Sequence, residues 1–392
     1  MVQSIMKYNF SKNFLSDVIK VTGKGKVNLH EPVFFGNEKK YLKKCIDDGY
    51  VSYVGKYVNL FEKKIKSYTK SKYCTALING TSALHILLRE MGVEKNDEVI
   101  LPSLTFVATA NAIRYCHAIP NFVDIEEETL GISPEKLEKY FEKNFLKKGK
   151  FCINRKTKRK VKILIAVHLF GMPCKIISIK KICAKYNIKV IEDAAEALGS
   201  FLKKKHLGNF SEAGVISFNG NKTITCGGGA VVISSNKSLI NRIRHLSTTA
   251  KIKHKWEYIH DDIGYNYRMT NLNAAVGCAQ IENIKKIIKA KRNNYLSYKN
   301  FIKNYKNIKL FKEPKNSQVN YWLITILFKG NKKLRNKILK ELNNKNINCR
   351  ALWKPLHLLK MYKDAPRDDL SSTINIYKHS INLPSSPSIS LK

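Results

Sequence analysis

The stretch GVISFNGNKTITCGGGAVVIS, residues 214–234, holds two short apolar runs on either side of a polar loop that ends in three glycines. Both runs are rich in valine and isoleucine, which favours strands, and the glycines at 227–229 let the backbone turn sharply before the second run. The stretch therefore predicts two buried strands joined by a loop. That loop carries a lysine, Lys222, five positions after Ser217.

Similar apolar runs alternate with amphipathic stretches from about residue 73 onward. The runs are YCTALI (73–78), EVILP (98–102), NFVD (121–124), KILIAV (162–167) and IKVIE (188–192), and helical patterns such as SALHILLREMG (82–92), SPEKLEKYFEKNF (133–145) and IISIKKICAKYN (176–187) lie between several of them. This alternation predicts an α/β fold with a mainly parallel sheet and helices on its faces. Ligands of such sheets bind beyond the carboxyl ends of the strands, so the residues that follow each strand are the candidates for chemistry.

The pattern changes after residue 267. A long helical segment at about residues 271–305 precedes the runs QVNYWLITILF (318–328), KKLRNKILKELNNKN (332–346) and LSSTINIYKHSI (370–381). We expect a large α/β domain over residues 31–270 and a smaller C-terminal α+β domain over residues 271–392. Residues 1–30 are polar and without a clear pattern, which predicts an irregular N-terminal arm.

The composition is strongly basic, with 71 Lys and Arg against 30 Asp and Glu and a formal net charge of +41. A basic surface that binds nucleic acid is usually clustered on one face or arm, whereas here the lysines are spread over nearly the whole chain. We therefore expect a solvated basic surface and no nucleic-acid partner. The one dense run, NRKTKRKVK (154–162), is predicted to be an exposed loop.

Nine cysteines are scattered singly, and none shows the spacing of zinc ligands. This pattern predicts reduced thiols, no metal site and a reducing compartment. The chain begins without the apolar run of a signal peptide, and ILIAVHLF (163–170) is too short to span a bilayer. We expect a soluble, cytoplasmic protein without membrane contact.

The end of the predicted strand YCTALI runs into Asn79, Gly80, Thr81 and Ser82. Gly80 permits a tight turn, and the two hydroxyls lie beside the free N–H groups of the next helix, an arrangement that suits a phosphate. The alternative is a plain Ser/Thr helix cap.

The end of the predicted strand IKVIE carries Asp193, flanked by alanines that leave room for a flat ligand. Its carboxylate could hold a proton on a ring nitrogen, or it could cap the following helix. Lys222 could form a Schiff base with a carbonyl, or it could be one more surface lysine in a lysine-rich chain.

Together these groups indicate one cofactor. A phosphate-binding turn, an acid for a ring nitrogen and a Schiff-base lysine are what pyridoxal phosphate requires, and they occur in order at successive strand ends. Phe106, which follows the strand EVILP, adds an aromatic face that could stack on the cofactor ring.

The motifs of the chain resemble those of the DegT-type sugar aminotransferases, which are pyridoxal-phosphate-dependent enzymes of fold type I. The likeness covers nearly the whole chain and includes the motifs NGTSALHILL (79–88), DEVILPSLTFVATANAI (97–113), VHLFGMPC (167–174), IEDAAEALGS (191–200), GVISFNGNKTITCGGGAVV (214–232) and GYNYRMTNLNAAVG (264–277). The resemblance implies a large domain with a mostly parallel sheet, a smaller C-terminal domain and a homodimer with shared active sites.

The resemblance also implies the roles of individual residues. Lys222 would hold the cofactor as a Schiff base, and Asp193 would pair with its ring nitrogen. The other residues implied to bind the cofactor are Phe106 on the ring, Glu196 beside it, Thr81, Ser82 and Ser217 at the phosphate, and Asn266 reaching in from a second subunit.

The implied reaction is transfer of an amine from glutamate to a nucleotide-linked 4-keto-6-deoxy sugar, for surface glycan biosynthesis. A branch of the family that removes a hydroxyl has histidine in place of the lysine, so Lys222 favours transamination. The all-glycine turn at 227–229 resembles the corresponding turn in the branch that acts on UDP-linked 4-keto-6-deoxy-N-acetylhexosamines. The alternatives are an enzyme like GDP-perosamine synthase and, more remotely, a non-catalytic regulator that binds pyridoxal phosphate.

Overall fold

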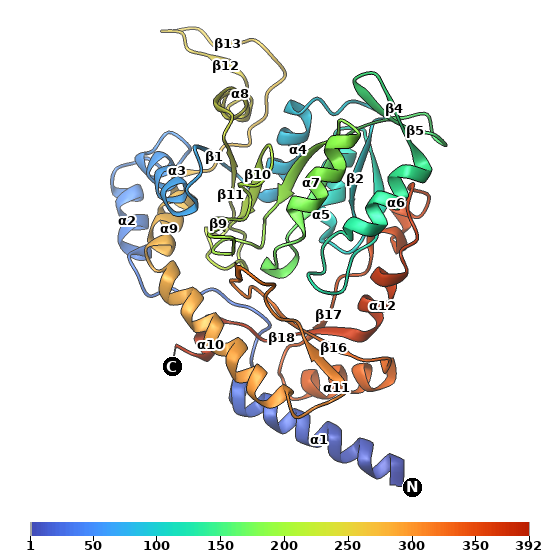
Figure 1. Ribbon diagram of the computed structural model, residues 1–392. Coiled ribbons are helices and arrows are strands. Elements are labelled where there is room, and N and C mark those ends of the chain that lie inside the picture. Colours follow the sequence, from blue (N-terminus) through green and yellow to red (C-terminus); the bar gives the residue numbers. More distant parts are fainter. Residues whose placement is uncertain (1, 392) are drawn as a thin grey trace.

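A central mixed sheet organises the larger lobe of the computed structural model, which describes residues 2–391. Along its main path the strand order is β1 (Tyr73–Leu77), β11 (Ala230–Ser234), β10 (Gly214–Ser217), β7 (Lys189–Asp193), β6 (Lys160–Val167), β2 (Glu98–Pro102) and β3 (Ile119–Val123) (Figure 1). Strand β11 is antiparallel to β1 and β10, and the pairs from β10 to β3 are parallel. The predicted α/β fold with a mainly parallel sheet is confirmed.

Alternate residues of these strands face two different helix layers, as the period of a strand requires. Leu101, Ile163 and Val215 pack with α4 (Gly80–Glu90), α5 (Val107–Tyr115) and α8 (Lys237–Ser247). On the other face, Leu164 packs with α6 (Pro134–Asn144) and α7 (Ile176–Lys185), while Ile216 packs with α3 (Lys56–Thr69) and α9 (Asn271–Glu282). Both faces are therefore covered, which explains the nearly continuous apolar strands.

The dense basic run at 154–162 is only partly the exposed loop that we predicted. A hairpin of β4 (Phe145–Lys148) and β5 (Phe151–Asn154) precedes it, and β6 already begins at Lys160. Asn154 is buried because its amide donates to the carboxylate of Glu98, which is itself fully buried. The sequence did not indicate this hairpin because its two short strands carry two lysines and only one β-branched residue.

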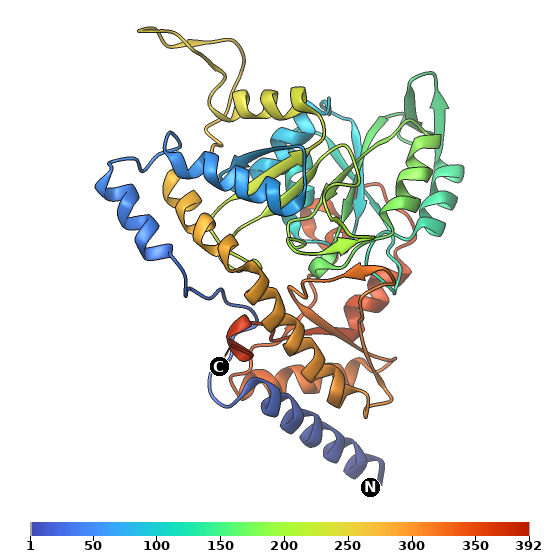
Figure 2. The same ribbon diagram turned by 60° about the vertical axis from the view of Figure 1, so that its left-hand side comes forward.

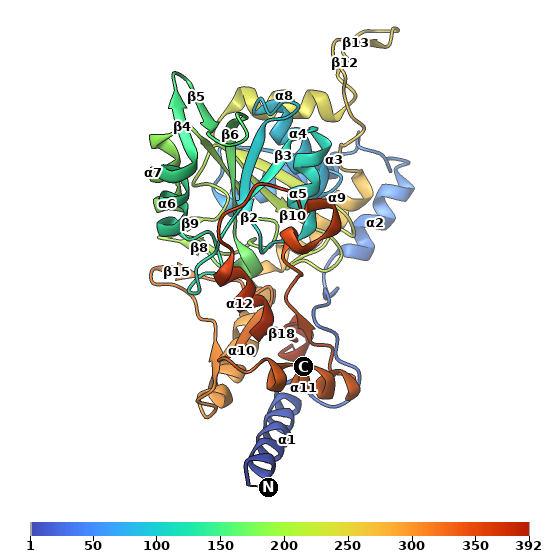
Figure 3. The ribbon, with the colours of Figure 1, turned by 90° about the vertical axis from the view of Figure 1, so that its right-hand side faces the viewer.

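A second lobe lies beneath the central sheet (Figures 1 and 3). Its antiparallel sheet has the order β14 (Ile308–Leu310), β16 (Ile324–Phe328), β18 (Ser380–Leu383) and β17 (Arg350–Ala351). The helices of this lobe are α10 (Ile284–Ile302), α11 (Lys332–Asn344) and α12 (Ser371–His379). One link between the lobes is Asp124, which follows β3 and accepts hydrogen bonds from the backbone N–H groups of Ser372 and Thr373 at the start of α12.

The expectation of an irregular N-terminal arm is wrong for Val2–Thr22, which form helix α1. Phe14 and Val18, one helical turn apart, are fully buried against Tyr298 and Phe328 of the second lobe. Figure 2 shows α1 lying along this lobe, at the end opposite the sheet. Tertiary packing rather than a strong amphipathic pattern defines this helix.

The division into residues 1–30, 31–270 and 271–392 stays a proposal. The packing suggests two changes to it: α1 would join the second lobe, and α9, whose Ala275 and Cys278 pack with Phe61 of α3, would join the first.

The remaining elements are short. Helix α2 (Glu38–Asp47) packs near α9, and a small sheet has the order β15 (Ser317–Gln318), β8 (Phe201–Leu202) and β9 (Lys205–His206). The hairpin of β12 (Lys251–Ile252) and β13 (Ile259–His260) projects away from the body of the molecule (Figures 1 and 2). Within residues 2–391, every helix is too short or too polar to cross a bilayer.

Candidate active site

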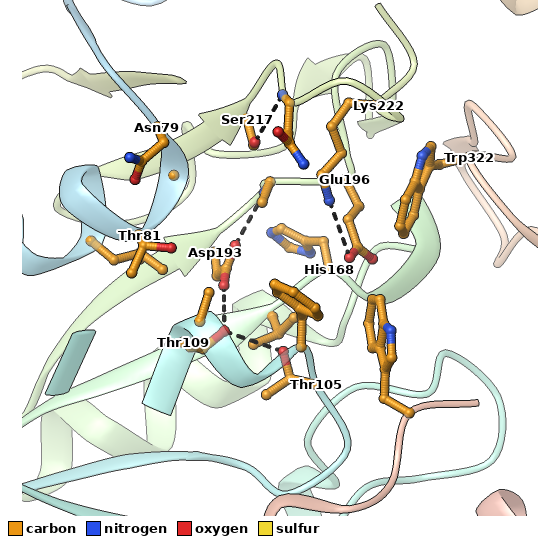
Figure 4. Close-up of a pocket in the computed structure, with 18 of the residues that line it drawn as sticks. Asn79, Thr81, Thr105, Thr109, His168, Asp193, Glu196, Ser217, Lys222 and Trp322 are labelled. Carbon is orange, nitrogen blue, oxygen red and sulfur yellow. Dashed lines mark hydrogen bonds and ion pairs between the residues drawn. The ribbon is translucent and has the colours of Figure 1, made fainter. Parts of the chain in front are cut away.

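A cavity of about 250 Å³ lies where the carboxyl ends of the central strands meet the second lobe (Figure 4). Its lining comes from the segments after β1, β2, β6, β7 and β10 and from three residues of the second lobe. The polar and aromatic lining residues are Asn79, Thr81, Thr105, Phe106, Thr109, His168, Asp193, Glu196, Ser217, Asn219, Asn221, Lys222, Trp322, Arg350 and Trp353.

Lys222 points into this cavity, so it is not a surface lysine. Its side chain is only 13% exposed, and its Nζ lies 3.5 Å from Oε1 of Glu196 and 4.1 Å from the centre of the Trp322 ring. The loop that carries it closes on itself, since the N–H of Cys226 donates to the carbonyl of Phe218.

The backbone of the turn after Lys222 requires glycine at two positions. Gly229 has φ +154°, and a Cβ at this position would lie 2.4 Å from Cε of Met269. Gly227, at φ +77°, is likewise in the region that favours glycine. Larger residues here would displace the loop and the lysine with it.

Asp193 ends β7 and lies on the floor of the cavity. Oδ2 accepts a hydrogen bond of 2.7 Å from the hydroxyl of Thr109, and Oδ1 accepts one of 3.1 Å from the N–H of Ala195. Residues 194–200 form turns and no helix, so the helix-cap alternative for Asp193 is wrong. The two hydrogen bonds fix the orientation of the carboxylate, as a partner for a ligand requires.

Glu196 lies between Lys222 and the segment after β6. Its Oε2 accepts a 2.6 Å hydrogen bond from the N–H of Phe170. Burial raises the pKa of this carboxyl to about 7, although the positive charge of Lys222 and the Phe170 N–H act in the opposite direction. Glu196 can therefore exchange a proton near neutral pH.

The N-terminus of α4 forms the end of the cavity suited to an anion. Asn79 caps this helix, because its Oδ1 accepts from the N–H of Ser82 at 2.8 Å. The cap is therefore Asn79, and neither Thr81 nor Ser82 is needed for it. Thr81 and Ser217 line the cavity, whereas Ser82 lies in the same helical turn but outside the lining.

Gly80 brings these groups together. A Cβ at Gly80 would lie 3.4 Å from Cβ of Ser217, so the helix start and the end of β10 are in close contact. Free N–H groups at a helix start and adjacent hydroxyls form an anion site.

Phe106 and Asn266 occupy contrasting positions. Phe106 is 48% exposed, and its ring lies 5.4 Å from that of Trp353, which leaves an aromatic surface open at the cavity. Asn266 is exposed and lies outside the cavity of its own chain, bridged to Thr248 after α8.

Several cavity residues were not predicted from the sequence. Trp322, Arg350 and Trp353 come from the second lobe, and Thr109 acts through Asp193. The sequence signal that could have suggested two of them is the presence of the tryptophans themselves, Trp322 and Trp353, in an otherwise lysine-rich segment.

Two histidines near the strand ends, His168 and His357, have structural partners. His168 lines the cavity but is fully buried, with Nε2 2.9 Å from Glu192 and Nδ1 accepting from the N–H of Cys174. His357 contacts the hydroxyl of Ser103 at 2.7 Å.

These residues fit pyridoxal phosphate. The amine of Lys222 is buried in the cavity and makes one side-chain hydrogen bond, at 3.5 Å, which leaves it able to bind a carbonyl. An oriented carboxylate, an exposed aromatic ring and a helix N-terminus surround the same space. In this arrangement Lys222 would hold the cofactor, Asp193 its ring nitrogen, and Thr81 with Ser217 its phosphate.

Comparison with known proteins gives the family. A model of the DegT/DnrJ/EryC1/StrS aminotransferase family matches residues 35–392. The chain is 37% identical over 365 residues to a GDP-perosamine synthase of Vibrio cholerae, with 93% of this chain and 95% of that protein covered. It is 34% identical to a putative pyridoxal phosphate-dependent aminotransferase of Bacillus subtilis, EpsN, with 92% and 91% covered.

Solved structures agree in fold. The chain superposes on Helicobacter pylori PseC, an aminotransferase involved in the biosynthesis of pseudoaminic acid, with a TM-score of 0.83 at 24% identity and with 92% and 94% of the two chains covered. The match of the family model over residues 35–392 shows that the chain belongs to the DegT/DnrJ/EryC1/StrS aminotransferase family. It is a pyridoxal-phosphate-dependent aminotransferase, as the motifs indicated.

Proposed function

Because the chain is an aminotransferase of this family, we propose that it transfers an amine from glutamate to the C4 carbonyl of a nucleotide-linked 4-keto-6-deoxy sugar. The products are 2-oxoglutarate and the corresponding 4-amino sugar. The observation that carries the proposal is the single cavity in which the amine of Lys222 and the oriented carboxylate of Asp193 face the same space.

The residues divide the work as follows. When bound, pyridoxal phosphate supplies an electron sink for the carbon that loses its proton. Asp193 keeps a proton on the ring nitrogen, and Thr109 holds Asp193 in the orientation that this requires. The Nζ of Lys222 carries the proton from the donor's α-carbon, first as a base and then as an acid. Trp322 and Trp353 of the second lobe line the cavity.

The sugar nucleotide is the finer part of the proposal. GDP-perosamine synthases of Vibrio cholerae and of Escherichia coli O157:H7 are 37% and 36% identical to this chain, which favours a GDP-linked substrate. The glycine turn at 227–229 instead supports a UDP-linked N-acetylhexosamine as the second candidate. Both are anionic, and the net charge of +41 would attract either.

We also propose a homodimer in which Asn266 completes the site of the partner subunit. Asn266 is exposed and lies outside its own cavity. The protein also exposes large apolar side chains on the segment 34–54 and on the β12–β13 hairpin, namely Phe34, Phe35, Tyr50, Tyr53, Val54, Trp256 and Tyr258. Such surfaces are typical of contacts between subunits.

The central test replaces the lysine. Lys222→Ala should abolish turnover and the visible absorbance of the lysine-bound cofactor, whereas Lys204→Ala, which changes an exposed lysine, should leave both unchanged. A yellow, active Lys222→Ala protein would refute the proposal. Product analysis with GDP- and UDP-linked 4-keto-6-deoxy sugars then identifies the substrate.

The shared site has its own test. Asn266→Ala and Lys222→Ala proteins, each inactive alone, should recover up to about a quarter of normal activity when unfolded together and refolded, since half of the dimers are mixed and each mixed dimer has one intact site. No recovery, although mixed dimers form, would show that Asn266 acts within its own subunit, and an Asn266→Ala protein that is active alone would show that it has no role.

A further inference from the structure

Trp322 lies on the segment between β15 and β16, and it contacts the loop that carries Lys222 in two ways. Its indole N–H donates a 2.7 Å hydrogen bond to the carbonyl of Asn221, the residue before Lys222. The face of the same ring lies 4.1 Å from Nζ of Lys222. In Figure 4 the lysine extends toward the carboxylate of Glu196, and the Trp322 ring lies to one side of them.

The position of Trp322 is fixed by buried hydrogen bonds. Its carbonyl accepts from Nζ of Lys291 at 3.2 Å and from the hydroxyl of Ser385 at 2.7 Å. Its N–H donates to Oδ1 of Asn320 at 2.9 Å, and the Asn320 amide in turn donates to the carbonyl of Glu196 at 2.7 Å. One segment of the second lobe therefore positions both neighbours of the lysine amine.

We propose that Trp322 and Glu196 together form a binding site for the Lys222 amine whenever this amine is not covalently bound. The inference rests on the proposed role of Lys222 and concerns only its free state. The ring face attracts the ammonium, the carboxylate forms an ion pair with it, and the indole hydrogen bond to Asn221 holds the loop in reach of both. Trp322 is thus a positioning residue, which keeps the freed amine close to the reacting carbon.

The other titratable groups nearby do not compete for the amine. His30 is buried with its ring 6.4 Å from that of Trp322, and burial together with the charge of Lys291 holds its pKa well below 6.5. Burial also lowers the pKa of Lys291 well below 10.5, and its Nζ is bonded to carbonyl oxygens of Trp322 and Ser385. Asp193 is held by Thr109 and Ala195.

The test measures how reactive the free amine is. Full-length protein freed of cofactor is pulsed with a trace of acetic anhydride at about pH 8, and mass spectrometry gives the acetylation of Lys222 relative to the exposed Lys237. Trp322→Leu removes the ring face and the N–H that hold the amine and its loop, so the amine is held less firmly and its acetylation should rise by about three- to tenfold. Glu196→Gln should also raise the acetylation of Lys222, although the side chain at position 196 keeps its shape.

Two further variants separate this effect from simple opening of the cavity. Trp353→Phe changes the other tryptophan that lines the cavity, whereas the cation–π contact of Lys222 is with Trp322, and should leave acetylation unchanged. Trp322→Phe keeps a ring but loses the hydrogen bond to Asn221, and should give an intermediate rate. The proposal is overturned if acetylation in both Glu196→Gln and Trp322→Phe equals that of the unmodified protein, or if Trp353→Phe raises it as much as Trp322→Leu does.

Failure of the inference differs from failure of the proposed function. In the first case the acetylation rates do not change, but addition of pyridoxal phosphate still gives a yellow protein that Lys222→Ala cannot form. In the second case Lys222→Ala forms the same yellow protein as the unmodified chain.

Discussion

Glutamine at position 196 should change how stability depends on pH, because Glu196 is a buried carboxyl with an unusual titration. In the folded protein its Oε2 accepts the Phe170 N–H at 2.6 Å, and its Oε1 lies 3.5 Å from Nζ of Lys222. Burial raises its pKa to about 7. Glutamine keeps the shape and the acceptor for Phe170 but cannot ionise.

The size of the effect follows from the two pKa values. As pH rises, the unfolded chain loses this proton near 4.5, and the folded protein loses it only near 7. The stability that protonated Glu196 provides is therefore complete below pH 4.5 and is lost as the pH rises through about 7. A difference of about 2.5 units corresponds to about 3 kcal/mol. The free energy of unfolding of Glu196→Gln, relative to the unmodified protein, should rise by about this amount between pH 4 and pH 8.

Urea unfolding of the two cofactor-free proteins, followed by circular dichroism at a series of pH values, measures this difference. The other carboxyl groups titrate alike in both proteins, so their contributions cancel. Glu257→Gln, at an exposed position on the β12–β13 hairpin, serves as the control and should give a constant difference. Curves for Glu196→Gln and the unmodified protein that stay parallel from pH 4 to pH 8 would refute the role of burial.

Three further substitutions test other parts of the structure. Asp193→Asn should retain some cofactor but slow its reaction with glutamate by orders of magnitude, measured by stopped-flow absorbance; normal rates would mean that the acid has no catalytic part. Asp124→Asn removes a fully buried charge that caps α12, and should destabilise the protein by about 2–4 kcal/mol in urea unfolding, whereas an unchanged midpoint would contradict its linking role. Gly229→Ala places a Cβ 2.4 Å from Met269 and should lower both the melting temperature and cofactor occupancy, while Gly220→Ala, whose nearest neighbour is at 3.8 Å, should change neither. Equal effects of the two alanines would exclude the steric explanation.

The sequence predicts the central sheet well because each of its strands is a short apolar run between turn residues. Since parallel strands place their carboxyl ends at one edge, Thr81, Asp193 and Lys222 could be expected in one site without any structure. The structure brings these three together in one cavity. It also removes the helix-cap alternative for Asp193, which local sequence could not distinguish from a ligand role.

Other parts of the site depend on contacts that local patterns do not record. Trp322 and Arg350 enter the cavity from the second lobe, and only the packing of the lobes gives them that position. Asn266 lies outside the cavity of its own chain, so its role needs a partner that a single chain does not contain. Helix α1 was missed for a similar reason, since Phe14 and Val18 gain their burial from a lobe hundreds of residues away.

The placement of the three tryptophans makes the protein a source of two optical signals. Trp322 and Trp353 line the cavity, and Trp322 is only 2% exposed, so this pair should emit at short wavelength and lose intensity by energy transfer to a coenzyme seated beside it. Trp256, 75% exposed on the projecting hairpin, should emit at long wavelength and respond only when something covers it. Intrinsic fluorescence can thus follow filling of the cavity and burial of the hairpin in a single spectrum, without any added dye.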